Sequence, residues 1–373
     1  MSGAGQFTTV HQVLPSLHVA DASGGHTLRL RQALRRAGLT SEIFVEQVDQ
    51  PLADQARPFG ELAGRVEPGR TAVLYQLSVG SALVDRLLER PEPLLVNYHN
   101  LTPASFFWEW APDWLDAVAL GRRQLYALAD RTVHAIADST FNQRDLVAAG
   151  YRSTAVVPPL VEVPARPPGS AGGAAADVGP VTGGGATRWL FVGKLLPHKG
   201  AHRLVQALAA YRAAYDPEAT LTVVGGAPIP AYRDAVVAYA GDLGLAGAVT
   251  MAGTVSDEEL DRRFAEAHVF VCLSAHEGFC FPLVEAMARD LPVVAWDTGA
   301  VADTAGDAAV LLRRPSAPVV AAAVHRVVTD GRLRRLLVRR GRARVAAFDV
   351  ERSGAALVAE VCRALAALDP RSR

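Results

Sequence analysis

The feature that most constrains this chain is a short β-rich run followed by a segment of helix length, repeated along its whole first half. The expected strands of this half are 7–14, 42–45, 72–77, 94–98, 132–137 and 154–157. Residues 26–38 have helical spacing, with arginines on the polar side. Ser139 stands where the N-cap of another helix is expected. Strands separated by helices predict a parallel α/β sheet.

The same alternation starts again after a segment of different composition. Residues 164–187 are almost entirely Pro, Gly and Ala, so they cannot bury a core and are interpreted as a linker. The expected strands beyond it are 189–192, 221–224, 249–252, 269–273 and 292–295, and the expected helices are 201–215, 232–243, 257–267 (capped by Ser256), 282–289 and 317–347.

This repetition predicts an α/β fold of two Rossmann-like domains facing each other across a cleft. The expected parts are an N-terminal, acceptor-side domain at 1–160, a Gly/Pro/Ala-rich linker at 161–187, a donor domain at 188–347, and a C-terminal helix at 348–373 that packs back toward the first domain. In such sheets, ligands bind outside the carboxyl ends of the strands. The loops that follow the strands are therefore where we look for chemistry.

The composition excludes several classes of protein. Basic and acidic residues number 38 each, which argues against a nucleic-acid-binding protein held by bulk charge. Half of the residues are hydrophobic, as in a folded chain with a large core. No apolar run approaches the roughly 20 residues of a membrane helix, and residues 1–17 lack a signal-peptide pattern, so we expect a cytoplasmic protein. Cys272, Cys280 and Cys362 are scattered and indicate neither a disulfide framework nor a metal site.

Only two of the 38 basic residues are lysines, and both lie in one loop. Lys194 and Lys199 occur in the sequence GKLLPHKG, directly after an expected strand. A lysine is a compact cation with three donors, which suits a phosphate group. The general preference for arginine is typical of codon bias, but that bias does not explain why both exceptions share one strand-end loop. We interpret them as diphosphate ligands.

A second strand-end loop, SAHEGFCFPLVE, carries two acids. Pro282 is placed to be the first residue of the next helix, because its ring presets φ and its missing N–H would have no partner there. The N–H groups of Leu283 and Val284 would then point out of the helix start, where anions bind. Glu277 and Glu285 flank this start, and carboxylates there favour recognition of sugar or ribose hydroxyls.

Four further features carry less specific information. Gly225 and Gly226 follow a strand, as do Gly24 and Gly25 in the first half, and glycine lets a ligand approach the backbone. His99 ends a strand, where it is either structural or functional. The aromatic residues Phe106, Phe107, Trp108 and Trp110 are interpreted as core or as an apolar wall of an acceptor pocket. The seven arginines between 332 and 344 are interpreted as a solvated helical face, with a membrane-surface or partner patch as the alternative.

These motifs resemble the retaining glycosyltransferases of family 4, which have the GT-B fold. The most specific part is HEGFCFPLVEAM, at 276–287, which is similar to the family's Glu-x7-Glu motif. VGKLLPHKG is similar to its Gly-Arg-…-Lys-Gly loop, and the segments 98–100 and 137–139 also fit. The resemblance covers nearly the whole chain apart from the linker. One departure is Lys194, where the family usually has arginine, whose planar fork a lysine lacks.

The resemblance implies a hexosyl transfer from a nucleotide-diphosphate sugar to an unidentified acceptor, with retention at the anomeric carbon and without a metal or cofactor. The implied catalytic residues are Glu277, His99 and Lys199. The implied donor-binding residues are Gly24, Gly25, Lys194, Lys199, Gly225, Gly278, Phe279, Cys280, Phe281, Leu283, Val284 and Glu285. Glu277 would contact the donor sugar, Glu285 the ribose, Lys199 the diphosphate and His99 the transferred sugar. A UDP- or GDP-linked donor is expected.

Three other functions are compatible with parts of this pattern. A nucleotide-sugar epimerase or hydrolase on the same fold is the main alternative. A dinucleotide oxidoreductase predicts a G-x-G-x-x-G turn, which the sequence lacks. A non-catalytic binding module would explain Lys194 as decay, but the intact glutamate pair argues against it. No nucleic-acid partner is expected, and a peripheral membrane contact stays open as the alternative for the arginine run without further support in the sequence. The acceptor, the sugar, the base, the linkage and the oligomeric state are not encoded in a readable motif.

Overall fold

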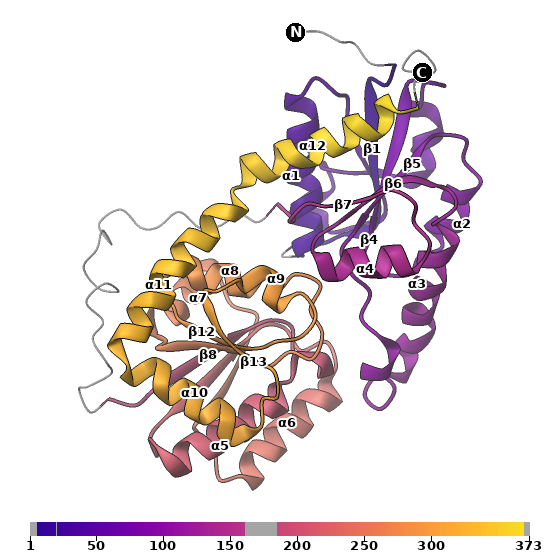
Figure 1. Ribbon diagram of the computed structural model, residues 1–373. Helices are drawn as coiled ribbons and strands as arrows, with labels where there is room; N and C mark the ends of the chain where they lie inside the picture. Colours follow the sequence, from indigo (N-terminus) through magenta and orange to yellow (C-terminus); the bar gives the residue numbers. More distant parts are fainter. Residues whose placement is uncertain (1–5, 20, 161–184, 369–373) are drawn as a thin grey trace. The chain divides into compact units, whose positions relative to one another are not determined.

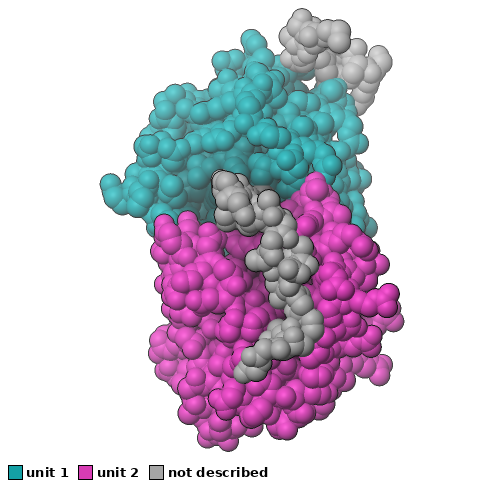
Figure 2. Space-filling view, turned by 90° about the vertical axis from the view of Figure 1, so that its left-hand side faces the viewer, with its two compact units in different colours: residues 1–104, 113–162, 348–373 teal, residues 105–112, 163–347 magenta. Residues whose placement is uncertain are grey.

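The computed structural model describes residues 6–19, 21–160 and 185–368. The chain divides into two compact units, unit 1 with residues 1–104, 113–162 and 348–373, and unit 2 with 105–112 and 163–347 (Figures 1 and 2). The expected linker at 161–187 lies outside the described residues except for its last three. Of the helices in the described ranges, none has the length and apolar character needed to cross a membrane.

Unit 1 is built on one parallel sheet. Its strands are β1 (Thr9–Leu17), β2 (Ile43–Val48), β3 (Arg57–Pro58), β4 (Thr71–Leu77), β5 (Leu94–Tyr98), β6 (Thr132–Ala137) and β7 (Thr154–Val156). They lie in the order β3-β2-β1-β4-β5-β6-β7, and every neighbouring pair is parallel. The order reverses between β1 and β4. Such a reversal opens a crevice at the carboxyl ends of the two strands.

Helices cover both faces of this sheet (Figure 1). They are α1 (Ala22–Arg36), α2 (Leu83–Leu88), α3 (Leu115–Ala127), α4 (Thr140–Ala148) and α12 (Val350–Ala366). Leu30 of α1 and Leu357 of α12 share one buried cluster with the strands, and Leu125 of α3 belongs to the cluster on the other face. Successive strand residues point to opposite faces, so each of the four central strands, β1, β4, β5 and β6, contributes to both clusters. The last helix of the chain is therefore part of the core of unit 1.

Unit 2 repeats this plan. Its strands are β8 (Arg188–Val192), β9 (Thr220–Val224), β10 (Val249–Gly253), β11 (Val269–Cys272), β12 (Val293–Trp296) and β13 (Ala309–Leu312), and its helices are α5 (Ala201–Ala214), α6 (Pro230–Asp242), α7 (Asp257–Glu266), α8 (Phe281–Ala288), α9 (Val301–Ala305), α10 (Ala317–Thr329) and α11 (Gly331–Val345). The parallel strands lie in the order β10-β9-β8-β11-β12-β13. The order reverses between β8 and β11, the two strands that precede the lysine loop and the Glu277 loop.

Most expected boundaries agree with the structure to within a few residues, and two differences bear on the interpretation of the motifs. Gly24 and Gly25 lie in the first turn of α1, not in a loop, because Asp21 caps the helix four residues earlier than expected; its carboxylate accepts from the Gly24 N–H at 3.3 Å. The single helix expected at 317–347 is two helices. Asp330 has extended backbone dihedrals and its carboxylate accepts from the N–H groups of Arg332 and Leu333, both at 3.0 Å, so it ends α10 and caps α11.

The arginine run is only partly the solvated face that its charge pattern predicts. Arg334 is buried and donates to the carbonyl of His268 at 2.7 Å. Arg342 makes two bonds, at 2.6 and 2.7 Å, to the carboxylate of the buried Asp290. Arg344 donates to the carbonyl of Thr304 at 2.9 Å. These side chains attach α11 to the rest of unit 2, whereas Arg332, Arg335 and Arg339 are exposed.

Candidate functional site

The lysine loop and the Glu277 loop contact each other where β8 and β11 end. The lysine loop closes with a 3-10 turn, η5 (Pro197–Lys199), and with Gly200 at φ 71°. A Cβ at position 200 would stand 2.4 Å from the carbonyl oxygen of Leu273, so only glycine permits this approach. The N–H of Ala275 donates to the carbonyl of His198 at 2.6 Å and fixes the two loops together. The chemistry-bearing side chains are thus held on two adjacent strand ends.

This contact joins Lys199 to Glu277. The Lys199 ammonium donates to both carboxylate oxygens of Glu277, at 2.8 and 2.9 Å. The Glu277 side chain is 6% exposed and the Lys199 side chain 22% exposed. Burial lowers the pKa of Lys199, but the adjacent Glu277 charge and its hydrogen bonds outweigh burial, so the pKa is raised above 10.5. The two residues expected to act on the donor form an ion pair at the reversal point of the sheet.

The other predicted residues of these loops are placed around the pair. A Cβ on Gly225 would lie 2.2 Å from the carbonyl oxygen of Gly193, so the loop after β9 packs on the backbone that leads to Lys194. Lys194 itself is exposed, unlike Lys199. Gly299, after β12, packs on the Glu277 backbone, and the Ala300 N–H donates to the Glu277 carbonyl at 2.9 Å. Loops from four adjacent strands therefore build this region.

Helix α8 begins one residue earlier than Pro282, the residue expected to be first. Phe281 is the first helical residue, Pro282 is the second, and Cys280 is the N-cap in a left-handed conformation at φ 74°. The Leu283 N–H donates to the Cys280 carbonyl at 3.1 Å, so this predicted anion donor is engaged within the first turn. Leu283 and Val284 are both buried. The tight start leaves Gly278 and Phe279 as the loop residues that link Glu277 to the helix.

Glu285 lies on α8 and is half-buried. Its pKa is raised above 4.5, chiefly by burial, although Arg289 lowers it and Asp257 and Asp261 add smaller upward shifts. A carboxyl with a raised pKa is easier to protonate than an exposed one, and it retains oxygen atoms that accept hydroxyl hydrogen bonds. Glu285 and Glu277 come from the two ends of one loop-and-helix segment.

His99 belongs to a buried polar chain in unit 1. Its Nδ1 lies 2.8 Å from Asp138 Oδ2 and its Nε2 lies 2.7 Å from Gln76 Oε1. The ring of His26 stands edge-on at 4.9 Å. Burial, then the neighbouring His99 and Arg29, hold the pKa of His26 well below 6.5. Both ring nitrogens of His99 are thus engaged with protein groups.

The aromatic residues after His99 divide between two environments. Phe107 is buried, Trp108 is 67% exposed, and the whole segment 105–112 groups with unit 2 although it precedes the expected boundary. Phe106 and Phe107 lie 5.8 and 5.9 Å from the ring of His198, and Trp110 lies 5.2 Å from Tyr232. The aromatic side chains of segment 105–112 therefore pack over the lysine loop. The sequence interpretation, core or an apolar wall of an acceptor pocket, did not specify this contact.

One cluster of side chains at the site was not predicted from the sequence. The thiols of Cys272 and Cys280 lie 3.9 Å apart, and both are buried beside Glu277. In the sequence the two cysteines are eight residues apart, a spacing that fits no common metal-binding or disulfide motif. The sequence contained one indication of this contact. Cys272 ends a strand and Cys280 precedes the next helix, so the short loop between them can bring the two thiols together.

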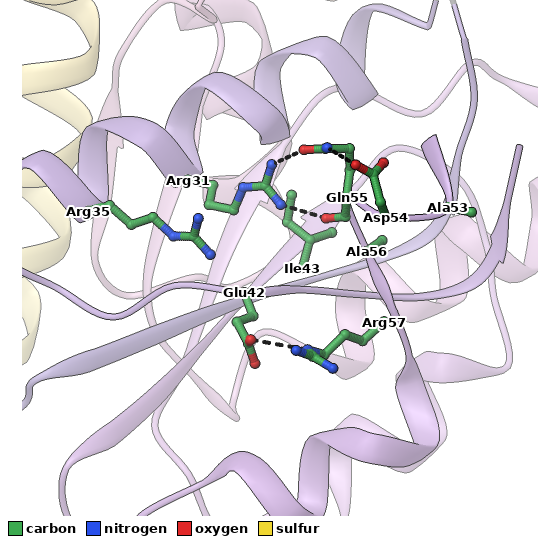
Figure 3. Close-up of a pocket in the computed structure, with 9 residues that line it drawn as sticks. All are labelled: Arg31, Arg35, Glu42, Ile43, Ala53, Asp54, Gln55, Ala56 and Arg57. Carbon is green, nitrogen blue, oxygen red and sulfur yellow. Dashed lines mark hydrogen bonds and ion pairs between the residues drawn. The ribbon is translucent and has the colours of Figure 1, made fainter. Parts of the chain in front are cut away.

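Unit 1 also contains a polar pocket of about 480 Å³ (Figure 3). It is lined by residues of α1, β2 and the segment 53–57. Arg57 pairs with Glu42 at 3.0 Å, and Arg31 donates to Gln55. Glu42 directly precedes β2, so the pocket lies at the amino ends of the strands. It is therefore at the opposite edge of the unit 1 sheet from His99, which follows the carboxyl end of β5.

Comparisons with known proteins agree with the geometry of unit 2. Residues 183–344 match the family described as glycosyl transferases group 1. A D-inositol 3-phosphate glycosyltransferase of Geodermatophilus obscurus is 33% identical over 252 residues, which are 65% of this chain and 54% of that protein. A GDP-mannose-dependent alpha-(1-6)-phosphatidylinositol monomannoside mannosyltransferase of Mycobacterium tuberculosis is 36% identical over 118 residues, 30% of each chain. The chain spans about half the length of the curated relatives it matches.

Solved structures extend the likeness to both units. A sucrose-phosphate synthase of Thermosynechococcus elongatus has a TM-score of 0.72 at 19% identity, covering 97% of this chain and 100% of that one. The Anabaena protein HepE in complex with UDP-glucose has a TM-score of 0.70 at 18% identity, covering 95% and 99%. At these identities the likeness concerns the fold. Residues 183–344 of the second unit are therefore similar to the group 1 glycosyl transferases, and the two parallel sheets have the GT-B fold.

Proposed function

We propose that this protein is a retaining, metal-independent glycosyltransferase of family 4 that moves a sugar from a UDP- or GDP-linked donor to an acceptor. The observation that carries the proposal is the Lys199–Glu277 pair at the reversal point of the sheet in unit 2. Relatives named as inositol-phosphate glycosyltransferases and mannosyltransferases support transfer more than epimerisation or hydrolysis. No cofactor enters the proposal.

The leaving group explains why a lysine is needed. Breaking the bond between the anomeric carbon and the diphosphate leaves negative charge on a phosphate oxygen. The Lys199 ammonium donates to that oxygen, and a charge-assisted hydrogen bond of this kind contributes about 1.5–3 kcal/mol. Lys194 and the start of α8 add positive potential. These groups take the part that a metal ion plays in other transferases.

Retention requires the acceptor to attack from the face that the diphosphate leaves. Glu277 is proposed to orient the donor sugar through its hydroxyls, and Glu285 to accept from the ribose hydroxyls. The donor-binding set also includes Gly24, Gly25, Gly225, Gly278, Phe279, Cys280 and Phe281. For His99 to contact the transferred sugar, its Nε2 has to exchange Gln76 for a sugar hydroxyl.

The test uses the full chain. Thermal unfolding is followed with UDP, GDP, ADP and dTDP, since a ligand that binds only the folded state raises the unfolding temperature. We expect UDP or GDP to stabilise the wild type, Lys199→Met to lose most of that shift, and Lys199→Arg to retain part of it. Arg332→Met removes an exposed charge of unit 2 and is the matched control. Equal shifts in the wild type and Lys199→Met would contradict the role of Lys199.

Turnover then tests the reaction itself. Nucleotide release is measured with UDP- and GDP-sugars and with acceptors that begin with inositol phosphate and phosphatidylinositol mannosides. We expect release to continue in EDTA, to fall at least a hundredfold in Glu277→Gln, and to give a product with the donor's anomeric configuration by NMR. Loss of activity in EDTA would refute metal independence, and an inverted product would refute retention.

A further inference from the structure

Two thiols lie next to the Lys199–Glu277 pair and form, together with the Glu277 carboxylate, a group of three metal-ligand side chains. Cys272 is the last residue of β11, Cys280 caps α8, and Glu277 lies in the loop between them. The two thiol sulfurs and one carboxylate oxygen of Glu277 all lie within 4.8 Å of one another, and all three side chains are buried. The loop folds back so that residues at its two ends meet.

The separation of the sulfurs favours a shared cation. The two Sγ atoms are 3.9 Å apart. A tetrahedral zinc ion with Zn–S bonds of about 2.3 Å places two thiolates about 3.8 Å apart. A disulfide requires a sulfur–sulfur distance of about 2.05 Å, so the loops would have to move to form one. The thiols are thus already spaced as a pair of zinc ligands.

The charges at the site also permit a divalent cation. In the structure, the Lys199 ammonium neutralises the Glu277 carboxylate. When a divalent cation binds, each thiol releases one proton to solvent, and the ion with two thiolates and one carboxylate has a net charge of −1. The ammonium balances that charge, so the buried site stays neutral overall. Uncompensated charge, the main cost of burying an ion, is thereby avoided.

We propose that Cys272, Cys280 and Glu277 bind a thiophilic divalent cation, Zn²⁺ or Cd²⁺, and that the bound ion inhibits the enzyme by taking the Glu277 carboxylate away from Lys199. The left-handed backbone of Cys280, at φ 74°, fits this assignment, because a cysteine there bears a conformational cost that glycine would avoid. Binding of the ion stands on the cluster alone, whereas inhibition rests on the proposed function.

The binding test uses the full chain, reduced with a phosphine and titrated with CdCl₂. Thiolate-to-cadmium charge-transfer absorption and equilibrium dialysis measure the number of ions bound and their affinity. We expect one ion per chain in the wild type and in Cys362→Ser, which removes the exposed cysteine. Cys272→Ala, Cys280→Ala and Glu277→Gln should each lose more than tenfold in affinity, because even partners outside the ligand shell typically contribute about 10–100-fold.

Two outcomes would overturn the binding proposal. One is a wild type without thiolate–cadmium absorption, a measurement that does not depend on any variant folding. The other is absorption that disappears in Cys362→Ser but remains in Cys272→Ala. Circular dichroism of each variant identifies any that fail to fold, and for those the wild-type dialysis decides.

Inhibition is tested separately with ZnCl₂ on nucleotide release by the wild type. We expect inhibition with the same midpoint as zinc binding, reversed by EDTA and unchanged in Cys362→Ser. Zinc that binds stoichiometrically without slowing release would refute the inhibitory role while leaving the ion site in place. If no nucleotide release occurs under any condition, the proposed function fails, and the cadmium titration still tests the ion site.

Discussion

Replacing Lys199 should destabilise unit 2 more than replacing Glu277, although the two form one ion pair. At 2.8 Å, and with an effective dielectric constant of about 20, the attraction is about 6 kcal/mol before desolvation is subtracted. Lys199→Met leaves a carboxylate that is 6% exposed without its cation, and such a loss costs about 3–5 kcal/mol. Glu277→Gln leaves an ammonium that is 22% exposed and partly hydrated, so we expect a cost of about 1–2 kcal/mol.

The double variant is the decisive one. Lys199→Met with Glu277→Gln removes both charges, so it should be more stable than Lys199→Met alone. We expect a coupling free energy of about 1.5–3 kcal/mol. Urea unfolding is followed by tryptophan fluorescence, because Trp108, Trp110, Trp189 and Trp296, four of the five tryptophans, belong to unit 2. Costs that add within about 0.5 kcal/mol would refute the reasoning.

The pair also has a pH signature. The pKa of Lys199 is raised above 10.5 in the folded protein, so the stability from the pair is fully present below 10.5. It is lost as the pH rises through the folded-state pKa, because the unfolded chain releases this proton first. Lys199→Met should lack this alkaline component of the unfolding free energy. An identical alkaline slope in wild type and variant would show that the proton belongs to another group.

Two further predictions concern backbone fit and acid stability. Gly200→Ala should lower the free energy of unfolding clearly more than Gly244→Ala. Both positions have a φ near 70°, but a Cβ would meet the Leu273 carbonyl only at position 200. Equal urea midpoints of the two variants would contradict the packing argument. Burial holds the pKa of His26 well below 6.5, so the unfolded chain takes up the proton first and unit 1 should lose stability as the pH falls below 6.5, by up to about 1.4 kcal/mol per pH unit. His26→Gln should have a flatter acid slope when unfolding is followed by circular dichroism, and an unchanged slope would assign the effect to other histidines.

The strands were the most predictable elements of this fold. β5 and β6 have the bounds that the sequence predicts, because each is a short, mostly apolar run, β5 between Pro93 and His99 and β6 between Arg131 and Asp138. Ser139 and Ser256 accept from the N–H three residues on, as N-caps do. These features depend on neighbouring residues only. Local patterns therefore located the strands and, through them, the loops that carry the site.

Features that depend on distant partners were not predictable in the same way. The caps at Asp21 and Asp330, which were not predicted, are a different case, because each carboxylate accepts from an N–H only three residues on and the information was local. The docking of Arg334 and Arg342 requires acceptors that lie 66 and 52 residues away in sequence. Charge spacing along a helix contains no information about such acceptors. A run of arginines consequently looks solvated in the sequence even when one member, Arg334, is buried and others bond to groups elsewhere in unit 2.

The contrast between the two lysines follows from the same distinction. Both were predicted from their rarity, and the structure places them differently: Lys199 is half-buried against a carboxylate 78 residues away, whereas Lys194 is exposed. An ammonium has three donors, and the two oxygens of Glu277 engage two of them. We expect the third to be directed to a diphosphate oxygen, so that one side chain links the carboxylate proposed to orient the sugar with the leaving group. A lysine at position 199 is then required for its geometry, whereas at position 194 its charge alone is sufficient.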